Sequence, residues 1–136
     1  MARRYDGEAV RNRVLSTSVR LFSERGYHGT TMAAILKESD VSSSSFQNVF
    51  GNKDGVRYEL MKLMFSGQFS AADSAAALLG PNASPAFAYA FETSIQLTIV
   101  ELSEIIRDLY LQAYISERSL EYIRAYRTNC VSDFGR

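Results

Sequence analysis

Residues 30–50 read TTMAAILKESDVSSSSFQNVF and decide the fold of the chain. They hold two short helical segments, Met32 to about Ser39 and Ser43 to Phe50, joined by a short turn. Asp40 in this turn tolerates the left-handed backbone that such a turn requires, although glycine is more usual there. Val41 is the apolar residue that would fix the turn to the core. The stretch therefore predicts a helix-turn-helix.

Hydroxyl side chains supply the caps of both helices. Either Thr30 or Thr31 can cap the first helix, whose Ile35 and Leu36 are expected to face inward. Either Ser42 or Ser43 can cap the second.

The second helix has an apolar face and a polar face. We expect Phe46, Val49 and Phe50 to face inward, which exposes Ser43, Ser44, Ser45, Gln47 and Asn48. Short hydroxyl and amide side chains can meet base edges in the DNA major groove, where Asn and Gln bond adenine with two hydrogen bonds. A serine-rich run is also typical of a flexible loop. The capped helices on either side favour a recognition helix.

Helical periodicity extends to both sides of this stretch. A preceding helix has an apolar face formed by Val10, Val14, Leu15, Ser18, Val19 and Phe22. Gly26 supplies its left-handed stop, and Tyr27 can pack back onto the helix. After the helix-turn-helix, Asn52 caps a helix with Asp54 in its first turn.

That helix runs toward Leu79, with an apolar side made of Val56, Leu60, Leu63, Met64, Ala71 and Ala75. Ser84 then caps a helix that begins at Pro85. Further helical pattern runs through Ile95, Leu102, Ile105, Leu109 and Ala113, and again from about Glu117. We find no convincing strand. The prediction is an all-α chain, with an N-terminal three-helix helix-turn-helix domain over residues 1–52 and a helical domain over residues 53–136.

The charges are unevenly distributed along the chain. The 136 residues have 15 basic and 15 acidic side chains, so the formal net charge is zero. Residues 1–57 hold nine basic and six acidic residues, a net of +3, and the remainder carries −3. Because a ligand meets a local surface, overall neutrality does not exclude nucleic-acid binding.

Several classes of protein are disfavoured by composition. Hydrophobic residues make up 46% and charged residues 22%, typical of a globular domain. No apolar run approaches the roughly 18 residues of a membrane span, and the charged N-terminus does not resemble a signal peptide. The single cysteine, Cys130, cannot form an internal disulfide, so we expect a cytoplasmic protein. With His28 as the single histidine, we expect no metal site, no cofactor and no enzymatic activity.

Residues 14–57 resemble the N-terminal domain of the tetracycline-repressor (TetR) family. The resemblance rests on Val14-Leu15, Phe22-Ser23-Glu24-Arg25-Gly26-Tyr27, Thr30-Thr31-Met32, Ile35, Val41-Ser42, Phe46, Phe50 and Lys53-Asp54, in register without a gap. It implies a dimeric transcription regulator, normally a repressor, that reads a palindromic DNA operator. Its C-terminal helices would bind a small-molecule effector and the partner subunit.

The resemblance also implies roles for single residues. Thr31 and Lys53 would contact phosphates, with Thr30 beside them, and Ser42 would cap the recognition helix. The groove-facing residues would be Ser43, Ser44, Ser45, Gln47 and Asn48. Arg3 and Arg4 would lie in an N-terminal arm that reaches the DNA backbone or the minor groove, or in a solvated tail.

The chain departs from the family pattern at several positions. Ser44-Ser45 replaces the usual Gly-Thr, Gln47 replaces a tyrosine that typically contacts a phosphate, Val49 replaces a histidine and Leu36 replaces a small residue. These changes affect operator sequence and affinity more than the fold. Family members are also longer, so we expect the helical domain to lack its last helices, or the dimer to form differently.

Aromatic and methionine residues cluster beyond residue 58. By analogy with the family, an effector pocket would be lined by Met64, Phe65, Phe91, Ile95, Tyr110 and Tyr114. Ordinary core packing is the alternative for each. Buried amides among Gln68, Gln96 and Gln112 would need partners that a ligand can provide.

Two functions remain open from the sequence. The first is an effector-responsive DNA-binding repressor. The second is a helical ligand-binding or protein-interaction module in which DNA binding is weakened or lost.

Overall fold

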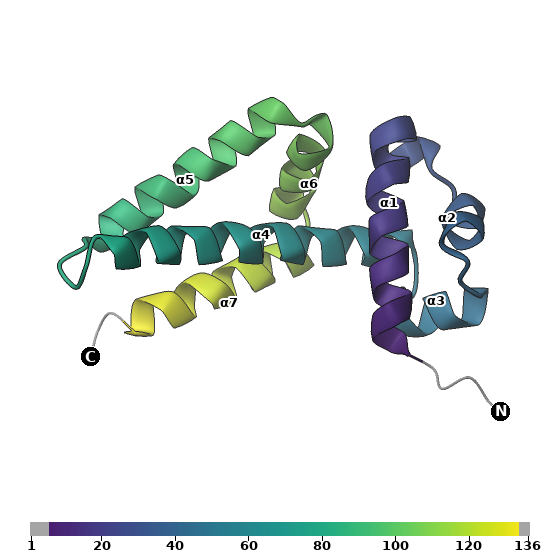
Figure 1. Cartoon of the computed structure of the whole chain (residues 1–136), viewed down its shortest axis with the longest axis horizontal. Helices are drawn as coiled ribbons and strands as arrows, with labels where there is room; N and C mark the ends of the chain where they lie inside the picture. Colours follow the sequence, from purple (N-terminus) through teal and green to yellow (C-terminus); the bar gives the residue numbers. More distant parts are fainter. Residues whose placement is uncertain (1–5, 134–136) are drawn as a thin grey trace. The chain divides into compact units, whose positions relative to one another are not determined.

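The computed structural model describes the backbone of residues 6–133 and the side chains of residues 6–126. Within these residues the chain is all-α, as predicted, with seven helices and no strand (Figure 1). The helices are α1 (Gly7–Gly29), α2 (Met32–Ser39), α3 (Ser43–Phe50), α4 (Lys53–Leu78), α5 (Pro85–Leu102), α6 (Glu104–Ile115) and α7 (Glu117–Asp133). Arg3, Arg4 and the Cys130 side chain lie outside the described part. No helix of the described residues is long and apolar enough to cross a membrane.

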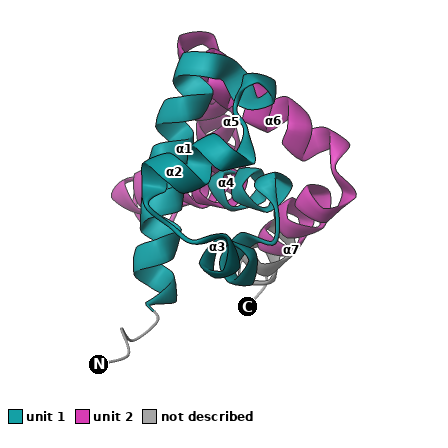
Figure 2. Ribbon diagram, turned by 90° about the vertical axis from the view of Figure 1, so that its right-hand side faces the viewer, with its two compact units in different colours: residues 1–60 teal, residues 61–136 magenta. Residues whose placement is uncertain are grey.

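The chain forms two compact units, residues 1–60 and residues 61–136 (Figure 2). Helix α4 contributes to both units. Its first two turns belong to the helix-turn-helix unit, and its remainder belongs to the second unit. The domain boundary expected from the sequence, between residues 52 and 53, falls at the start of this helix.

The core of the first unit forms where α1 packs against α2 and α3. Val14, Leu21, Ile35, Phe46 and Val56 are almost completely buried there, together with Val10, Leu15 and Phe22. The expectation that Val19 faces this core is wrong, since 48% of Val19 is exposed. Val19 follows Val14 by five residues, about 140° around a helix, whereas Leu21 follows it by seven and returns to the buried side.

The backbone at the helix ends matches the sequence closely. Gly26 has φ 72° and ψ 165°, so it interrupts α1, although helical geometry resumes up to Gly29. Thr31 caps α2 by accepting a hydrogen bond from the Ala34 N–H at 3.2 Å. Asp40 is left-handed, with φ 53° and ψ 48°, and Val41 is buried.

The second unit is built around the later part of α4. Phe65 makes an edge-to-face contact with Tyr110 of α6 at 5.1 Å, and Phe69 stacks on Tyr126 of α7 at 4.1 Å between ring centroids. The buried side of this part of α4 consists of Met61, Phe65, Gln68, Phe69 and Ala72.

Three residues that the sequence placed on apolar helical faces are exposed instead. Leu63 and Ala71 lie off the buried row of α4, which repeats every three or four residues from Met61. Leu102 is 80% exposed because α5 ends there and Ser103 starts a new helix as its cap.

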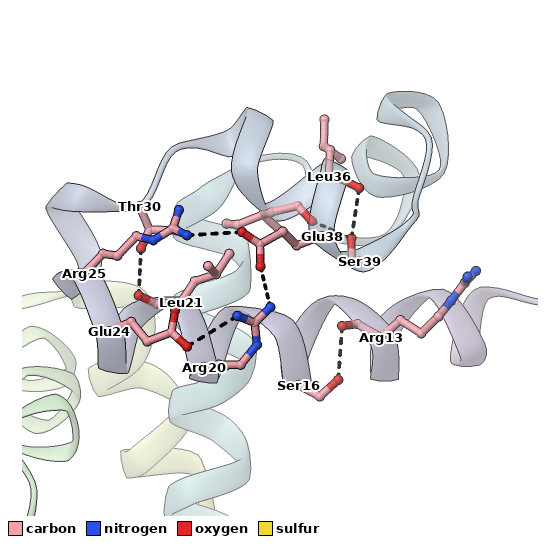
Figure 3. Close-up of polar contacts among 11 residues, drawn as sticks. Arg13, Ser16, Arg20, Leu21, Glu24, Arg25, Thr30, Leu36, Glu38 and Ser39 are labelled. Carbon is pink, nitrogen blue, oxygen red and sulfur yellow. Dashed lines mark hydrogen bonds and ion pairs between the residues drawn. The ribbon is translucent and has the colours of Figure 1, made fainter.

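Helices α1 and α2 are also joined by an ion-pair network (Figure 3). The Glu38 carboxylate accepts hydrogen bonds from the guanidinium groups of Arg20 and Arg25, and Arg20 also bonds Glu24 at 3.4 Å. The hydrogen bond from Arg20 is the main cause that lowers the pKa of Glu38 below its ordinary value. The network therefore fixes α2 against α1 most firmly when Glu38 is ionised.

We expect a Glu38→Gln substitution to destabilise the first unit near pH 7 and to have no effect in acid. The folded pKa of Glu38 lies below the unfolded value of about 4.3, so its stabilisation is present above that value and is lost as the pH falls through the lowered pKa. Urea unfolding of both proteins at several pH values measures the difference. In an Arg20→Gln/Arg25→Gln background the Glu38 change should have no effect; an unchanged effect there would contradict the assignment.

Gly55 allows the start of α4 to pass close to the end of α3. A Cβ at this position would lie 1.9 Å from the carbonyl oxygen of Phe50, whereas a Cβ at Gly67 of the same helix meets nothing within 4 Å. We expect Gly55→Ala to destabilise the protein by roughly 2 kcal/mol or more, because the new methyl group would force the backbone of Phe50 or of Gly55 to move. Gly67→Ala, the matched control, should stabilise it by about 0.5–1 kcal/mol through helix propensity. Equal effects in urea unfolding would show that the close approach does not exist.

Candidate nucleic-acid interface

Helix α3 presents a polar surface on one side of the helix-turn-helix unit. Ser43, Ser44, Gln47 and Asn48 are exposed, and Ser45 is half-buried. Phe46 and Phe50 point into the core, where their rings lie 5.3 Å apart, and Val49 is half-buried. The five polar residues that the sequence grouped therefore lie on one short helix.

The serines at the start of α3 form a hydroxyl cluster. Ser42 caps the helix, since its Oγ accepts the Ser45 N–H at 3.2 Å. The same oxygen lies 2.9 Å from the Ser45 hydroxyl and 3.2 Å from the Ser44 hydroxyl. Because these hydroxyls are turned toward the cap, the amides of Gln47 and Asn48 are the groups on this helix best suited to base edges.

Thr30 and Thr31, adjacent in sequence, have different surroundings. Thr31 is exposed at the start of α2. Thr30 is completely buried, and its hydroxyl is bonded to the carbonyl oxygens of Leu21 at 3.2 Å and Gly26 at 2.8 Å. The Thr30 side chain, which we grouped with the DNA-contacting residues, is thus used inside the unit, where it closes the broken end of α1.

Lys53 joins three helix ends. Its ammonium group donates hydrogen bonds to the carbonyl oxygens of Tyr27 at 2.9 Å and Thr30 at 3.0 Å. It also lies 4.2 Å from the centroid of the Tyr27 ring. An ammonium has three N–H donors, so two of them hold the connection from α1 to α2 and the third is left for another acceptor.

Two cations of α4, Lys53 and Arg57, lie over the Tyr27 ring. Arg57 approaches it at 4.4 Å, and Phe22 contacts it edge to face at 5.2 Å, as the predicted packing against α1 requires. The Tyr27 hydroxyl donates to the carboxylate of Asp54, which also pairs with Arg57 at 2.8 Å. Burial, assisted by the hydrogen bond to Asp54, raises the pKa of Tyr27 to about 12, so the phenol remains a donor at neutral pH.

The positive charge of the first unit is partly neutralised by its own acids. Arg11 pairs with Glu59 at 2.6 Å and Arg13 with Asp40 at 3.9 Å, and Arg20 and Arg25 pair with Glu38 as described above. Lys37 is an exposed cation on α2 with no ion pair among the described residues. Lys37 was not among the candidate DNA-contacting residues expected from the sequence. Its position on the exposed side of α2, opposite the buried Ile35, is the signal in the sequence that would have indicated an exposed cation.

The residues assigned to an effector pocket differ in how far they are buried. Phe65 and Tyr110 are buried and in ring contact, and Tyr114 lies 6.3 Å from Phe65 between centroids. Met64 and Ile95 are half-buried. Phe91 is partly exposed and stacks on Phe87 at 6.1 Å.

Gln68 of α4 is almost completely buried in the second unit. Its Oε1 accepts a hydrogen bond from the Tyr110 hydroxyl, and its Nε2 donates to Glu92 of α5 at 3.3 Å. Burial raises the pKa of Tyr110 to about 12, with a further contribution from Tyr114. The protein itself therefore supplies partners for this buried amide.

The other predicted polar residues lie at the surface or part-buried. Gln96 bonds the Tyr114 hydroxyl at 3.4 Å, and Gln112 is half-buried. His28 is exposed, with its ring edge-on to Tyr27 at 5.4 Å. The part of the chain that the structure describes contains no group of three His, Cys, Asp or Glu side chains placed to hold a metal ion.

We expect Lys53→Met to destabilise the first unit by about 1–2 kcal/mol. The substitution keeps the aliphatic stem but removes two charge-assisted hydrogen bonds and the cation over Tyr27. Urea unfolding followed by circular dichroism measures the change. Lys37→Met is the matched control and should be nearly neutral; equal stabilities of the two variants would contradict the bonding assigned to Lys53.

Comparisons with known proteins identify the first unit. Residues 14–60 match the model of the family "Bacterial regulatory proteins, tetR family". The chain is 36% identical over 55 residues to the HTH-type transcriptional regulator HbdR of Aromatoleum sp. (strain CIB), a match that covers 40% of this chain and 24% of that relative. No solved structure matches the chain significantly. Residues 14–60, which hold the helix-turn-helix and the first two turns of α4, are therefore similar to the tetR family of bacterial regulatory proteins, and the match spans about a quarter of the length of that relative.

Proposed function

We propose that this chain is a DNA-binding transcriptional repressor that a small-molecule effector releases from its operator. The observation that carries the proposal is the exposed amide and hydroxyl surface of α3, on a capped helix-turn-helix inside the region that matches the tetR family. The name of the relative, an HTH-type transcriptional regulator, agrees with it.

In this proposal α3 enters the major groove, because its helix exposes groups that match base edges. The groove-facing residues are Ser43, Ser44, Ser45, Gln47 and Asn48. Thr31 at the start of α2 contacts a phosphate, and so does the third N–H of Lys53. Arg3 and Arg4, outside the described residues, belong to an arm that follows the DNA backbone or the minor groove.

The operator is proposed to be palindromic and the protein a homodimer. A single short recognition helix buries too little surface to hold a specific site, and two copies on two half-sites double it. Residues 1–52 read DNA in this proposal, and residues 53–136 bind the effector and the partner subunit. The location is the cytoplasm, and no catalytic role is assigned.

The proposed effector site lies around the buried ring pair of Phe65 and Tyr110, with Tyr114, Met64, Ile95 and Phe91 around it. The support is chemical: a buried hydrogen-bond pair, Gln68 with Tyr110, lies among aromatic rings, as in many ligand-binding sites. A ligand that offers its own donor or acceptor to Gln68 would exchange with the bonds from Tyr110 or to Glu92 and shift the helices that carry them.

A second function is favoured by one feature of the site. Gln47 replaces the tyrosine that usually contacts a phosphate. Lys53 donates two hydrogen bonds to backbone carbonyl oxygens of the protein itself, so fewer of its donors are left for DNA. A helical ligand-binding or protein-interaction module with weakened DNA binding would have these properties. Binding to generic duplex DNA at rising salt separates the two: a repressor shows a steep loss of affinity with salt, and an interaction module shows little binding at any salt.

The operator is obtained by selection on random duplexes with the full chain. On the selected site we expect Asn48→Ala and Gln47→Ala each to cost about 1–3 kcal/mol, roughly 5- to 150-fold in affinity, and to relax the base preference at single positions. Asn12→Ala, an exposed asparagine on α1, is the matched control and should bind like wild type. Fluorescence anisotropy measures all three. Equal affinities for the α3 variants and the control would refute the docking of α3.

A further inference from the structure

Helix α3 carries no charged side chain. Its residues read SSSFQNVF from Ser43 to Phe50, with no acidic residue in the first turn and no basic residue in the last. The segment around it is rich in charge, since residues 1–57 hold nine basic and six acidic side chains. The helix that enters the major groove in the proposed function therefore has only neutral groups with which to recognise bases.

This composition leaves α3 without the side chains that read a G·C pair best. In the major groove, guanine accepts two hydrogen bonds at O6 and N7 from an arginine or a lysine, and the N4 amino group of cytosine donates to an aspartate or a glutamate. Helix α3 offers neither a cation nor a carboxylate. Its serine hydroxyls can bond to several bases, so they select none of them strongly.

The two amides of α3 are matched to adenine. The amide of Gln47 or of Asn48 can donate a hydrogen bond to adenine N7 and accept one from the N6 amino group. Both side chains are exposed. The hydroxyls of Ser44 and Ser45, in contrast, lie 3.2 and 2.9 Å from the capping oxygen of Ser42. The amides are thus the groups of α3 that can make a two-bond contact with a base.

The two cations that flank α3 in the chain do not supply the missing guanine contact. The ammonium group of Lys53 is held by the carbonyl oxygens of Tyr27 at 2.9 Å and Thr30 at 3.0 Å. Lys37 belongs to α2, and the first helix of a helix-turn-helix crosses the DNA backbone while the second lies in the groove. Both cations are therefore placed for phosphates, which carry no sequence information directly.

We infer that each half-site of the operator presents at least two A·T pairs to α3, with one adenine read by Gln47 and another by Asn48. The major-groove edge of an adenine has a single N6–N7 pair, so it accepts one amide with two bonds. Gln47 and Asn48 are consecutive and lie about 100° apart around the helix, which directs them to different bases. This inference rests on the proposed function, because it names the base pairs that the proposed DNA-binding surface selects.

The first test uses the full wild-type chain and chemically altered DNA. Selection on duplexes with a randomised centre gives the preferred site, in which we expect A·T pairs at two or more positions of each half-site. Replacing one of these adenines by 7-deazaadenine, which lacks N7, removes one of the two bonds and leaves the minor groove unchanged. We expect the affinity, measured by fluorescence anisotropy, to fall by roughly 3- to 10-fold at each position that an amide reads.

The second test changes the amides themselves. Asn48→Arg should exchange A·T for G·C at one selected position, with a preference of roughly 5- to 150-fold, and Gln47→Arg should do so at another. Asn12→Arg, at an exposed asparagine of α1, adds the same charge and should leave the selected bases unchanged. In the Asn48→Ala protein, 7-deazaadenine should lose its effect at the position that Asn48 reads and keep it at the position of Gln47.

Two results would overturn the inference and leave the proposed repressor intact, because DNA binding is retained in both. The first is a selected site with G·C pairs at the positions whose preference the alanine variants relax. The second is an A·T-rich site in which 7-deazaadenine has no effect at any position, since the sequence would then be read through the shape of the DNA. This measurement needs only the wild-type protein, so it decides even where an arginine variant does not fold.

A different result would refute the proposed function. If the full chain shows no salt-dependent binding to any duplex, both the repressor and the inference about its operator are wrong.

Discussion

The helix-turn-helix unit depends on the ammonium group of Lys53. It lies where the broken end of α1, the start of α2 and the start of α4 meet, and it satisfies carbonyl oxygens of the first connection. These carbonyls lie at the C-terminal end of α1, where Tyr27 also accepts the N–H of Thr30 at 3.3 Å and Thr30 is the C-cap. Tyr27 also belongs to this junction. Its ring lies under the cations of Lys53 and Arg57 of α4, and its hydroxyl donates a hydrogen bond to Asp54. Helix α3 packs against α1 and is followed directly by α4, so this junction lies next to the element that carries the candidate interface.

Most of the helix-turn-helix could be predicted from the sequence because its signals are local. The left-handed Asp40, the break at Gly26 and a serine cap at Ser42 or Ser43 each depend on one residue and its immediate neighbours. The choice between Thr30 and Thr31 could not be made in the same way. Both can cap a helix, and only the packing of α1 draws Thr30 into the core to bond Leu21 and Gly26.

The exposure of the polar residues on α3 was predictable from the sequence, but the contacts of the other candidate residues were not. The spacing places Gln47 and Asn48 on the outer side of α3 correctly. It cannot reveal that Lys53 bonds residues more than twenty positions earlier in the chain, or that Gln68 meets Tyr110 over 42 positions. Such pairs depend on tertiary packing. Val19 and Leu63 were assigned to the wrong side of their helices for a different reason, since both lie off the row of buried residues that repeats every three or four positions.

The close approach at Gly55 has a mechanical consequence. The carbonyl oxygen of Phe50, the last residue of α3, lies directly against the backbone of Gly55 in the first turn of α4. No side chain separates the two main chains. A contact of two main chains cannot yield by changing a rotamer, so the last turn of α3 and the first turn of α4 must translate together. Within this unit, a displacement of the first turn of α4 toward α3 would therefore move the last turn of α3.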